Sequence, residues 1–295
     1  MRPATPLTRG GPAVVALGGG HGLAATLQAV RRYAGEITAV VSVADDGGSS
    51  GRLRLAMGGG APGDVRKCLV ALGDPASLWA DAFEYRFPAG DLAGHSLGNL
   101  ILAGLTAVTG DFTAAVAEAG RLLGAQGRVL PATTKPVSLR ATTATGEVDG
   151  QVAVMHAGRL SAVSVVPPDA EAPEEAVEAI ARADQVVIGP GSLFTSVLAV
   201  AVVPGLSEAL RTTRARRVYV CNLRPQTPET EGFDVAAHLD ALAAHGVEVD
   251  VVVADTTWME KGDVAVGCVE AQVGRADGAV HDPVKLASVL ADLFG

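Results

Sequence analysis

Cysteine is scarce in this chain of 295 residues, which contains Cys68, Cys221 and Cys268 and no others. The three are far apart in the sequence and lie among apolar residues, so they match neither a zinc-ligand spacing nor a disulfide framework. Isolated thiols of this kind are typical of proteins in a reducing compartment, and we therefore expect a cytoplasmic protein.

Aromatic residues and positive charge are also in short supply. Aromatic residues make up 4% of the chain and hydrophobic residues as a whole 48%, so the core must be built mainly from alanine, valine and leucine. The formal net charge is -9, and an acidic protein is a poor match for the phosphate backbone of a nucleic acid. We therefore expect no nucleic-acid partner.

The sequence has no apolar run long enough to predict a membrane span. The longest uncharged apolar stretch, residues 192–207, contains Pro204 and Gly205 and is shorter than a full span. Residues 1–12 carry arginines ahead of an apolar run, as a secretory signal does, but that run soon breaks into glycines. We expect a disordered lead-in over residues 1–12 and a single α/β domain over residues 13–295.

Glycine, by contrast, is abundant, with 36 residues gathered at the ends of apolar runs. The first such run, Val14–Leu17, leads into a glycine turn and then into residues with a helical spacing up to Val30. A second apolar run covers residues 37–43. This pattern predicts a buried strand, a turn, a helix and a second strand. The turn consists of Gly18, Gly19, Gly20, His21 and Gly22.

This first glycine turn is suited to an anion. Glycine lets a ligand approach the backbone closely, and the first N–H groups of the following helix lack partners and carry the positive end of its dipole. Residues 20–25 match the dinucleotide pattern G-x-G-x-x-A, with Asp45 near the place of a ribose-binding acid. Many such turns are only tight turns, so the motif alone leaves ligand binding and a structural role equally open.

A second polar segment follows the second predicted strand. It reads Asp45-Asp46-Gly47-Gly48-Ser49-Ser50-Gly51-Arg52-Leu53-Arg54. This segment is not expected in a hydrophobic core, because it contains two adjacent carboxylates, several small residues and two arginines. We expect it to be a flexible loop that holds a metal ion or a phosphate. Further along, Asp64 is placed to cap a helix that begins at Val65.

Residues 94–98, Gly-His-Ser-Leu-Gly, match the G-x-S-x-G pattern of hydrolase nucleophiles. That pattern requires a buried strand directly before it, whereas residues 87–93 read as a broken loop, so an acyl-transfer serine is disfavoured. A helix is predicted over residues 97–109. At the start of this helix, the side chains of residues 95, 96 and 99 could face a pocket. Alternatively, Ser96 could serve only as a structural N-cap, and the sequence leaves both interpretations open.

Short strands are expected between about residues 128 and 168, one of them at Val152–Val154, as a β-rich insertion or an edge addition to the main sheet. After it the opening pattern returns, because a strand at residues 185–188 leads into a second glycine turn at residues 189–192. In doubly wound sheets, ligands bind where strand ends meet at a reversal of strand order. Two such turns predict a shared crevice in an α/β, Rossmann-like, mostly parallel sheet with helices on both faces. A lid-like loop is expected at residues 224–232.

In their order and spacing, these motifs resemble one group of proteins. They are Asp45–Arg54, Pro62-Gly63-Asp64-Val65-Arg66, Gly94-His95-Ser96-Leu97-Gly98-Asn99-Leu100, Gly189-Pro190-Gly191-Ser192 and Val220-Cys221-Asn222-Leu223. The chain resembles the gluconeogenesis factor family (YvcK-like proteins) within the CofD-like superfamily, which includes 2-phospho-L-lactate transferase. The resemblance covers about residues 13–290.

The resemblance implies a nucleotide or nucleotide-sugar site. YvcK-like members are cytoplasmic bacterial proteins that are needed for normal cell shape on gluconeogenic carbon sources and that bind UDP-activated amino sugars. The transferase branch instead moves a phospholactyl group from a guanylylated donor to a deazaflavin precursor, with a divalent metal. By this likeness Mg²⁺ would lie at Asp45 and Asp46, the candidate catalytic residues. The nucleotide and its phosphates would contact Gly18, Gly19, Gly20, His21, Gly22, Ser49, Ser50, Arg52, His95, Ser96, Asn99, Gly189, Gly191, Ser192 and Asn222.

Three positions depart from the family pattern. His21 stands where threonine is usual, Phe233 where tyrosine is common, and Val280 where an arginine often precedes the final His-Asp-Pro. A neutral His21 can still donate a hydrogen bond to a phosphate. If the other two positions contact the ligand, this protein lacks a hydroxyl and a positive charge there, which affects the sugar end and leaves the phosphate turns untouched.

Two functions of different classes are therefore expected. The first is a regulatory protein of cell shape and cell-wall metabolism that binds a UDP-sugar, as a monomer or a homodimer. The second is a phospho-group transferase in which Asp45 and Asp46 hold Mg²⁺ against a diphosphate while Arg52 and Arg54 neutralise developing charge. The scarcity of aromatic residues to stack a flavin-like acceptor favours the first.

Overall fold

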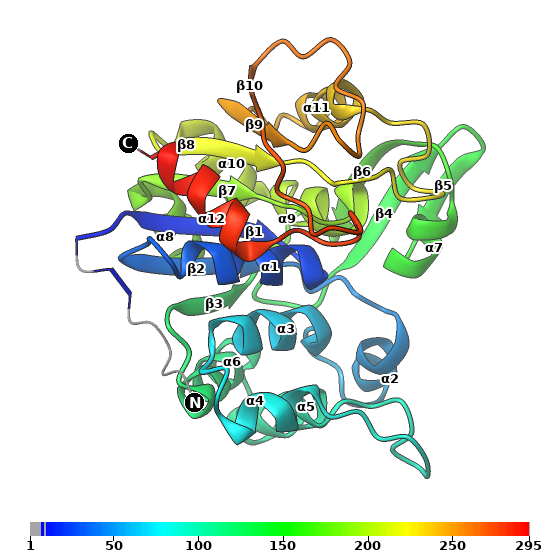
Figure 1. Ribbon diagram of the computed structural model, residues 1–295. Coiled ribbons are helices and arrows are strands. Elements are labelled where there is room, and N and C mark those ends of the chain that lie inside the picture. The colour runs from blue at the N-terminus through cyan, green and yellow to red at the C-terminus, as the bar shows by residue number, and fades with distance from the viewer. Residues whose placement is uncertain (1–6, 9, 295) are drawn as a thin grey trace.

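The computed structural model describes residues 7–8 and 10–294, so the lead-in expected over residues 1–12 lies largely outside them. Seven strands form the main sheet: β1 (Ala13–Gly18), β2 (Glu36–Val41), β3 (Arg128–Pro131), β7 (Gln185–Ile188), β8 (Arg216–Val220), β9 (Val251–Ala254) and β10 (Gly267–Glu270). Their order is β10-β9-β8-β7-β1-β2-β3, and every neighbouring pair is parallel (Figure 1). The α/β, mostly parallel fold expected from the sequence is confirmed.

The strand order reverses between β1 and β7. From β1 the chain proceeds outward through β2 to β3, whereas β7 begins a second series that proceeds the other way to β10. The register pairs Leu17 with Ile188, which brings the residues after both strands side by side. Such a reversal opens a crevice at the carboxyl ends of the strands.

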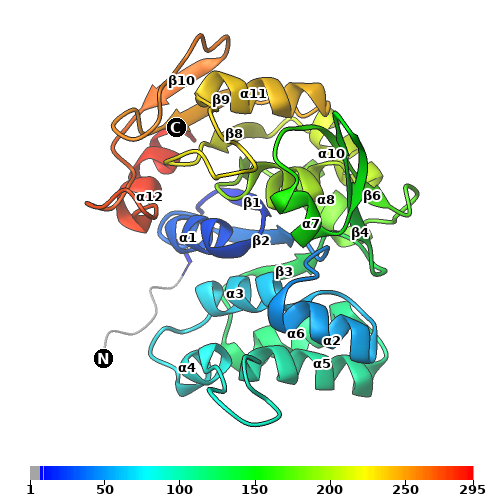
Figure 2. The same cartoon turned by 90° about the vertical axis from the view of Figure 1, so that its right-hand side faces the viewer.

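Helices cover both faces of the sheet because its strands are apolar on both sides. The helices α1 (Gly20–Val30) and α12 (Pro283–Asp292) lie on one face, and α8 (Glu174–Arg182), α9 (Ala199–Ala201) and α10 (Pro204–Thr212) on the other (Figures 1 and 2). The π-helix η1 (Leu193–Leu198) leads into α9, and α11 (Val235–Ala244) lies near β9 and β10.

A group of five helices lies beyond β3, at the bottom of Figure 1. It comprises α2 (Gly48–Met57), α3 (Pro62–Leu72), α4 (Leu78–Glu84), α5 (Leu97–Thr109) and α6 (Phe112–Leu123). In the described part of the chain no single helix is both long and apolar enough to cross a membrane, although the bent pair Leu193–Ala201 and Pro204–Thr212, at 77° to each other, passes on length and composition.

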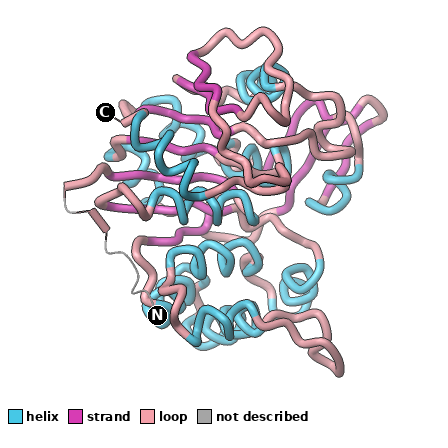
Figure 3. The backbone as a smooth tube through the Cα atoms, in the orientation of Figure 1, coloured by secondary structure: helices cyan, strands magenta, loops and turns pink. Residues whose placement is uncertain are grey.

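The β-rich insertion is smaller than expected. It contains β4 (Ser138–Thr143), β5 (Gly146–Asp149), α7 (Gln151–His156) and β6 (Leu160–Val166), and its antiparallel order is β5-β4-β6 (Figure 3). The segment from residue 128 divides between the two alternatives, because β3 is added at the edge of the main sheet and the insertion begins only at β4. The strand predicted at Val152–Val154 is wrong, because these residues are helical. Three residues are too few for periodicity to separate a strand from a helix.

Two further local predictions are corrected. The segment over residues 45–54 is not a flexible loop throughout, because it becomes helical at Gly48. The buried positions of this helix are mostly glycine and serine, so the segment lacks the apolar periodicity by which a helix is predicted. Asp64 does not cap a helix that starts at Val65. The helix starts at Pro62, whose ring fixes a helical φ, and Ala61 occupies the N-cap position.

Candidate functional site

The two glycine turns touch each other at the reversal of strand order. A Cβ on Gly22 would overlap the carbonyl oxygen of Pro190, and a Cβ on Gly191 would lie 3.4 Å from the carbonyl oxygen of Gly19. Thr26 in α1 donates a hydrogen bond of 2.8 Å to the carbonyl of Gly189. The sequence predicted that residues 18–22 and 189–192 share a crevice, and the structure places them against each other.

The start of α1 offers unpaired backbone donors at this junction. Its N-cap residue is Gly19, which has no side chain to cap the first N–H groups. Gly20 has φ +65°, a left-handed value that glycine adopts without strain. Since α1 has 11 residues, its aligned peptide dipoles favour an anion at this end.

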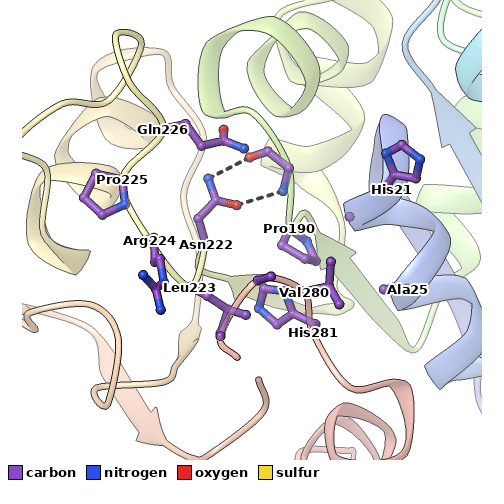
Figure 4. Close-up of a pocket in the computed structure, with 14 residues that line it drawn as sticks. His21, Ala25, Pro190, Asn222, Leu223, Arg224, Pro225, Gln226, Val280 and His281 are labelled. Atoms are coloured by element: carbon purple, nitrogen blue, oxygen red, sulfur yellow. Dashed lines mark hydrogen bonds between the residues drawn. The ribbon is translucent and has the colours of Figure 1, made fainter. Parts of the chain in front are cut away.

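A cavity of about 380 Å³ opens beside the two turns (Figure 4). Four segments distant in the sequence surround it: α1, the turn after β7, the residues after β8 and the residues before α12. Its lining consists of His21, Gly22, Ala25, Pro190, Gly191, Asn222, Leu223, Arg224, Pro225, Gln226, Gly278, Ala279, Val280 and His281. The volume lies within the range of small-ligand sites, which favour such strand-order reversals.

Asn222 holds the second glycine turn in place. Its Oδ1 accepts a hydrogen bond of 3.0 Å from the N–H of Gly191, and its Nδ2 donates one of 3.0 Å to the carbonyl of the same residue (Figure 4). The side chain is 7% exposed. Asn222, expected to contact the nucleotide, therefore lines the cavity and also shapes it.

The far wall of the cavity is formed by Arg224 and His281, which the sequence did not single out as site residues. The Arg224 guanidinium lies over the Trp258 ring, 4.5 Å from its centroid, and donates to the carbonyl of Asp277. His281 is paired with the carbonyl of Cys221 at 3.1 Å, and burial lowers its pKa to about 4. The ring is therefore neutral and donates from Nε2, which leaves Nδ1 as an acceptor.

A second polar group adjoins α1, and it pairs Asp45 with Asp64 rather than with Asp46. A Cβ on Gly19 would lie 2.5 Å from Oδ2 of Asp64, and a Cβ on Gly63 would lie 3.2 Å from Oδ2 of Asp45. Burial, and then the charge of Asp64, raise the pKa of Asp45 against the opposing hydrogen bond from the Gly47 N–H. Asp64 therefore lies at the start of α1, where the sequence predicted phosphate, and Asp45 lies beside it at the start of α3.

The Lys67 ammonium belongs to the same group. It lies 3.1 Å from Oδ1 of Asp64, with its side chain 23% exposed. Its charge is the largest cause of a lowered pKa at His21, followed by burial, while Asp64 opposes the shift. The His21 ring is therefore neutral at neutral pH and offers an N–H to a phosphate, with a cation close by.

Asp46 points away from this group. Its Oδ2 accepts from the N–H of Gln151 at 3.0 Å and its Oδ1 from the N–H of Val152 at 2.9 Å. These are the first N–H groups of α7, so the carboxylate caps a helix of the insertion. Asp45 and Asp46 are adjacent in the sequence but serve different parts of the structure.

Three other candidate residues lie in a buried chain of hydrogen bonds behind α2. Arg66 Nε–H donates to Oδ1 of Asn99 at 3.1 Å, and Nδ2 of Asn99 donates to Oγ of Ser49 at 3.0 Å. The Ser49 hydroxyl pairs with Nδ1 of His95 at 2.9 Å. Burial and the charges of nearby arginines lower the pKa of His95, which favours the neutral ring. These residues join α2, α3 and α5 and do not line the cavity.

The remaining candidates divide between the two regions. Ser50 Oγ accepts from the N–H of Gly63 at 3.1 Å, beside Asp45. The exposed Arg52 donates to the carbonyl of Ala93. Ser96 stands at the N-cap position of α5, but its hydroxyl is fully buried and makes no hydrogen bond to any described residue. Without a base or access to solvent, Ser96 lacks the features of a hydrolase nucleophile.

Two residues near the second turn differ from expectation. The Ser192 hydroxyl hydrogen-bonds the buried carboxylate of Glu229, a residue that the sequence did not mark. Phe233 packs edge-on against Phe194 and His238 and is absent from the cavity lining. Val280, by contrast, lines the cavity and is 42% exposed.

The acid pair suits Mg²⁺ only in part. Carboxylate and hydroxyl oxygens from Asp45, Asp64 and Ser50 are the ligand type that Mg²⁺ prefers. Among the described residues, however, no group of three histidine, cysteine, aspartate or glutamate side chains is placed to hold a metal ion. This donor set fits a cation bound by one or two carboxylates together with ligand phosphates.

Comparison with known proteins agrees with the motifs and the fold. The model of the family described as 2-phospho-L-lactate transferase CofD matches residues 14–280. A putative gluconeogenesis factor of Mycobacterium tuberculosis is 46% identical, over 94% of this chain and 89% of the relative. The gluconeogenesis factor of Bacillus subtilis is 43% identical, over 79% of this chain and 75% of the relative.

A solved structure is similar over almost the whole chain. It is a UPF0052 family protein from Bacillus halodurans, with a TM-score of 0.89 and 38% sequence identity, and the match covers 94% of this chain and 97% of that one. Identity at this level over this length establishes common ancestry as well as a common fold. The chain belongs to the gluconeogenesis factor family, which is related to the CofD family.

Proposed function

We propose that this protein is a cytoplasmic regulatory protein that binds a UDP-sugar in the cavity at the reversal of strand order and acts in cell shape and cell-wall metabolism during gluconeogenic growth. One observation carries the proposal: the uncapped start of α1 opens onto a cavity whose walls come from four separate segments. The family of the chain gives the proposal its biological setting.

In this proposal the diphosphate lies at the start of α1. Backbone N–H groups, the neutral His21 ring and the Lys67 ammonium supply donors there. The nucleoside or the sugar then extends along residues 222–226 and 278–281. Val280 at this wall leaves the ligand without the positive charge that an arginine would supply.

Calorimetric titration with UDP-N-acetylglucosamine, UDP and GDP, with and without Mg²⁺, tests the proposal. We expect saturable binding of the UDP compounds, and about tenfold weaker binding by Lys67→Ala, since it removes one charge-assisted contact. Lys135→Ala, at an exposed position outside the cavity lining, is the matched control. The absence of binding across the whole panel would contradict the proposal.

A second candidate function, a phospho-group transferase, is favoured by the Asp45–Asp64 pair next to α1. When bound there, Mg²⁺ would supply Lewis-acid stabilisation of charge on a diphosphate. The residues of the chain would orient the donor at the start of α1 and neutralise its charge through Lys67. Turnover of a guanylylated phospholactate with a deazaflavin acceptor would place this function first, whereas UDP-sugar binding without turnover supports the regulatory one.

A further inference from the structure

The Glu229 carboxylate lies against the start of η1, directly after the second glycine turn. Its Oε1 accepts hydrogen bonds of 2.8 Å from the N–H groups of Phe194 and Thr195, and one of 3.2 Å from the hydroxyl of Thr195. Ser192 adds a further side-chain hydrogen bond. With 3% of its surface exposed, Glu229 is a buried acid whose partners are polar groups of one short segment.

This contact connects the second glycine turn to a wall of the cavity. Thr230, the next residue along the chain, is fully buried and closes a turn with Gln226: its N–H donates to the Gln226 carbonyl at 2.7 Å, and its hydroxyl accepts from the Gln226 N–H at 2.8 Å. Gln226 lines the cavity (Figure 4). Hydrogen bonds from η1 to Glu229, the chain from Glu229 to Thr230, and the hydrogen bonds of Thr230 with Gln226 therefore connect η1 to the cavity wall.

Burial is the largest influence on Glu229 and raises its pKa, so the ionised form is less favourable in the folded chain than in water. Groups that oppose folding in this way are frequent at functional sites. Hydrogen bonds from the N–H groups of Phe194 and Thr195 offset this cost and fix the carboxylate against the start of η1.

We propose that Glu229 is a positioning residue for the ligand cavity: its carboxylate holds residues 224–230 against the start of η1 and thereby fixes the wall that Gln226 presents to the nucleotide. The inference rests on the proposed nucleotide site. It assigns Glu229 no contact with the ligand, because the residue is absent from the cavity lining.

The test compares Glu229→Ala with Glu229→Gln in the full chain. Hydrogen–deuterium exchange of residues 222–232 is measured without nucleotide, and UDP-N-acetylglucosamine affinity by calorimetry. We expect Glu229→Ala to raise exchange and to weaken binding, each by about tenfold, because the loop loses its hydrogen bonds to the N–H groups of Phe194 and Thr195. Glu229→Gln keeps an acceptor oxygen and should restore both values to within about threefold.

Glu231→Ala is the matched control, because Glu231 is an exposed acid on the same loop; both values should stay at the wild-type level. If the alanine variant does not fold, Glu229→Asp takes its place, with changes in the same direction, since its carboxylate is set back by one methylene. Wild-type exchange in Glu229→Ala, or raised exchange with unchanged affinity, would overturn the inference. A wild-type chain that binds no nucleotide would defeat the proposed function, while the exchange measurement still decides whether Glu229 holds the loop.

Discussion

Asn222 hydrogen-bonds both backbone groups of Gly191, with 3.0 Å from the glycine N–H to Oδ1 and 3.0 Å from Nδ2 to the glycine carbonyl. This pair joins the residue after β8 to the turn after β7. This second glycine turn also packs against Gly22 in α1. The position of the second glycine turn at the cavity therefore depends on one buried amide side chain.

Asn222→Asp is predicted to weaken UDP-sugar binding by about tenfold or more. The aspartate keeps an acceptor for the Gly191 N–H, but it loses the donor to the carbonyl and adds negative charge beside a phosphate site. Calorimetry measures the change, and Asn222→Ala separates the lost hydrogen bonds from the added charge. Equal affinity of the aspartate variant and the wild type would show that this pair does not shape the site.

Val280→Arg is predicted to tighten nucleotide binding by roughly three- to tenfold. Val280 lines the cavity and is 42% exposed, so an arginine there adds a positive charge to the wall along which the anionic ligand extends. Val284→Arg is the control, because Val284 is 56% exposed on α12 and lies outside the cavity lining. The gain should shrink as salt concentration rises. Equal gains in both variants would instead indicate a general effect of net charge.

Asp45→Asn is predicted to keep or raise thermal stability at neutral pH while it removes any effect of Mg²⁺ on nucleotide affinity. The pKa of Asp45 is raised, by burial first and then by Asp64. Its contribution to stability is therefore present at low pH and is lost as pH rises through the folded-state pKa. Asparagine stays neutral and still accepts from the Gly47 N–H. A large fall in the melting temperature of Asp45→Asn, with the effect of Mg²⁺ on nucleotide affinity unchanged, would contradict the prediction.

His281 is predicted to make the fold sensitive to acid. Burial lowers its pKa from 6.5 to about 4. The neutral ring therefore contributes stability that is fully present above pH 6.5 and is lost as pH falls toward 4, roughly 3 kcal/mol in all. His281→Gln, which keeps a donor for the Cys221 carbonyl, should flatten this part of the stability profile. The comparison is made by denaturant unfolding between pH 7 and 4, and parallel profiles would contradict the assignment.

The sequence predicted the parts of the site that follow directly from strand ends. Residues 18–22 and 189–192 each follow a buried apolar strand, and parallel strands bring their carboxyl ends to one edge of the sheet. The reversal of order between β1 and β7 then sets the two turns against each other. This relationship needs only local pattern and the topology of doubly wound sheets.

Other parts of the site depend on contacts between residues that are distant in the chain. Asp46 caps α7, which lies about a hundred residues later in the chain. Glu229 accepts a hydrogen bond from the start of η1, some 35 residues before Glu229. No local pattern distinguishes such a carboxylate from a ligand-binding one, so the pair Asp45–Asp46 was predicted where the structure has Asp45–Asp64. The resemblance indicated Val280 in the wall before α12, whereas no local pattern marked its neighbour His281 as a site residue.

The central claim is that a diphosphate lies at the start of α1, between the two glycine turns. A crystal structure of the protein with UDP-N-acetylglucosamine and Mg²⁺ tests it most directly. We predict phosphate oxygens within hydrogen-bond distance of the N–H groups of Gly20, His21 and Gly22, with the rest of the ligand along Asn222 and Val280. Ligand density at another surface, with the start of α1 occupied by solvent alone, would contradict the account.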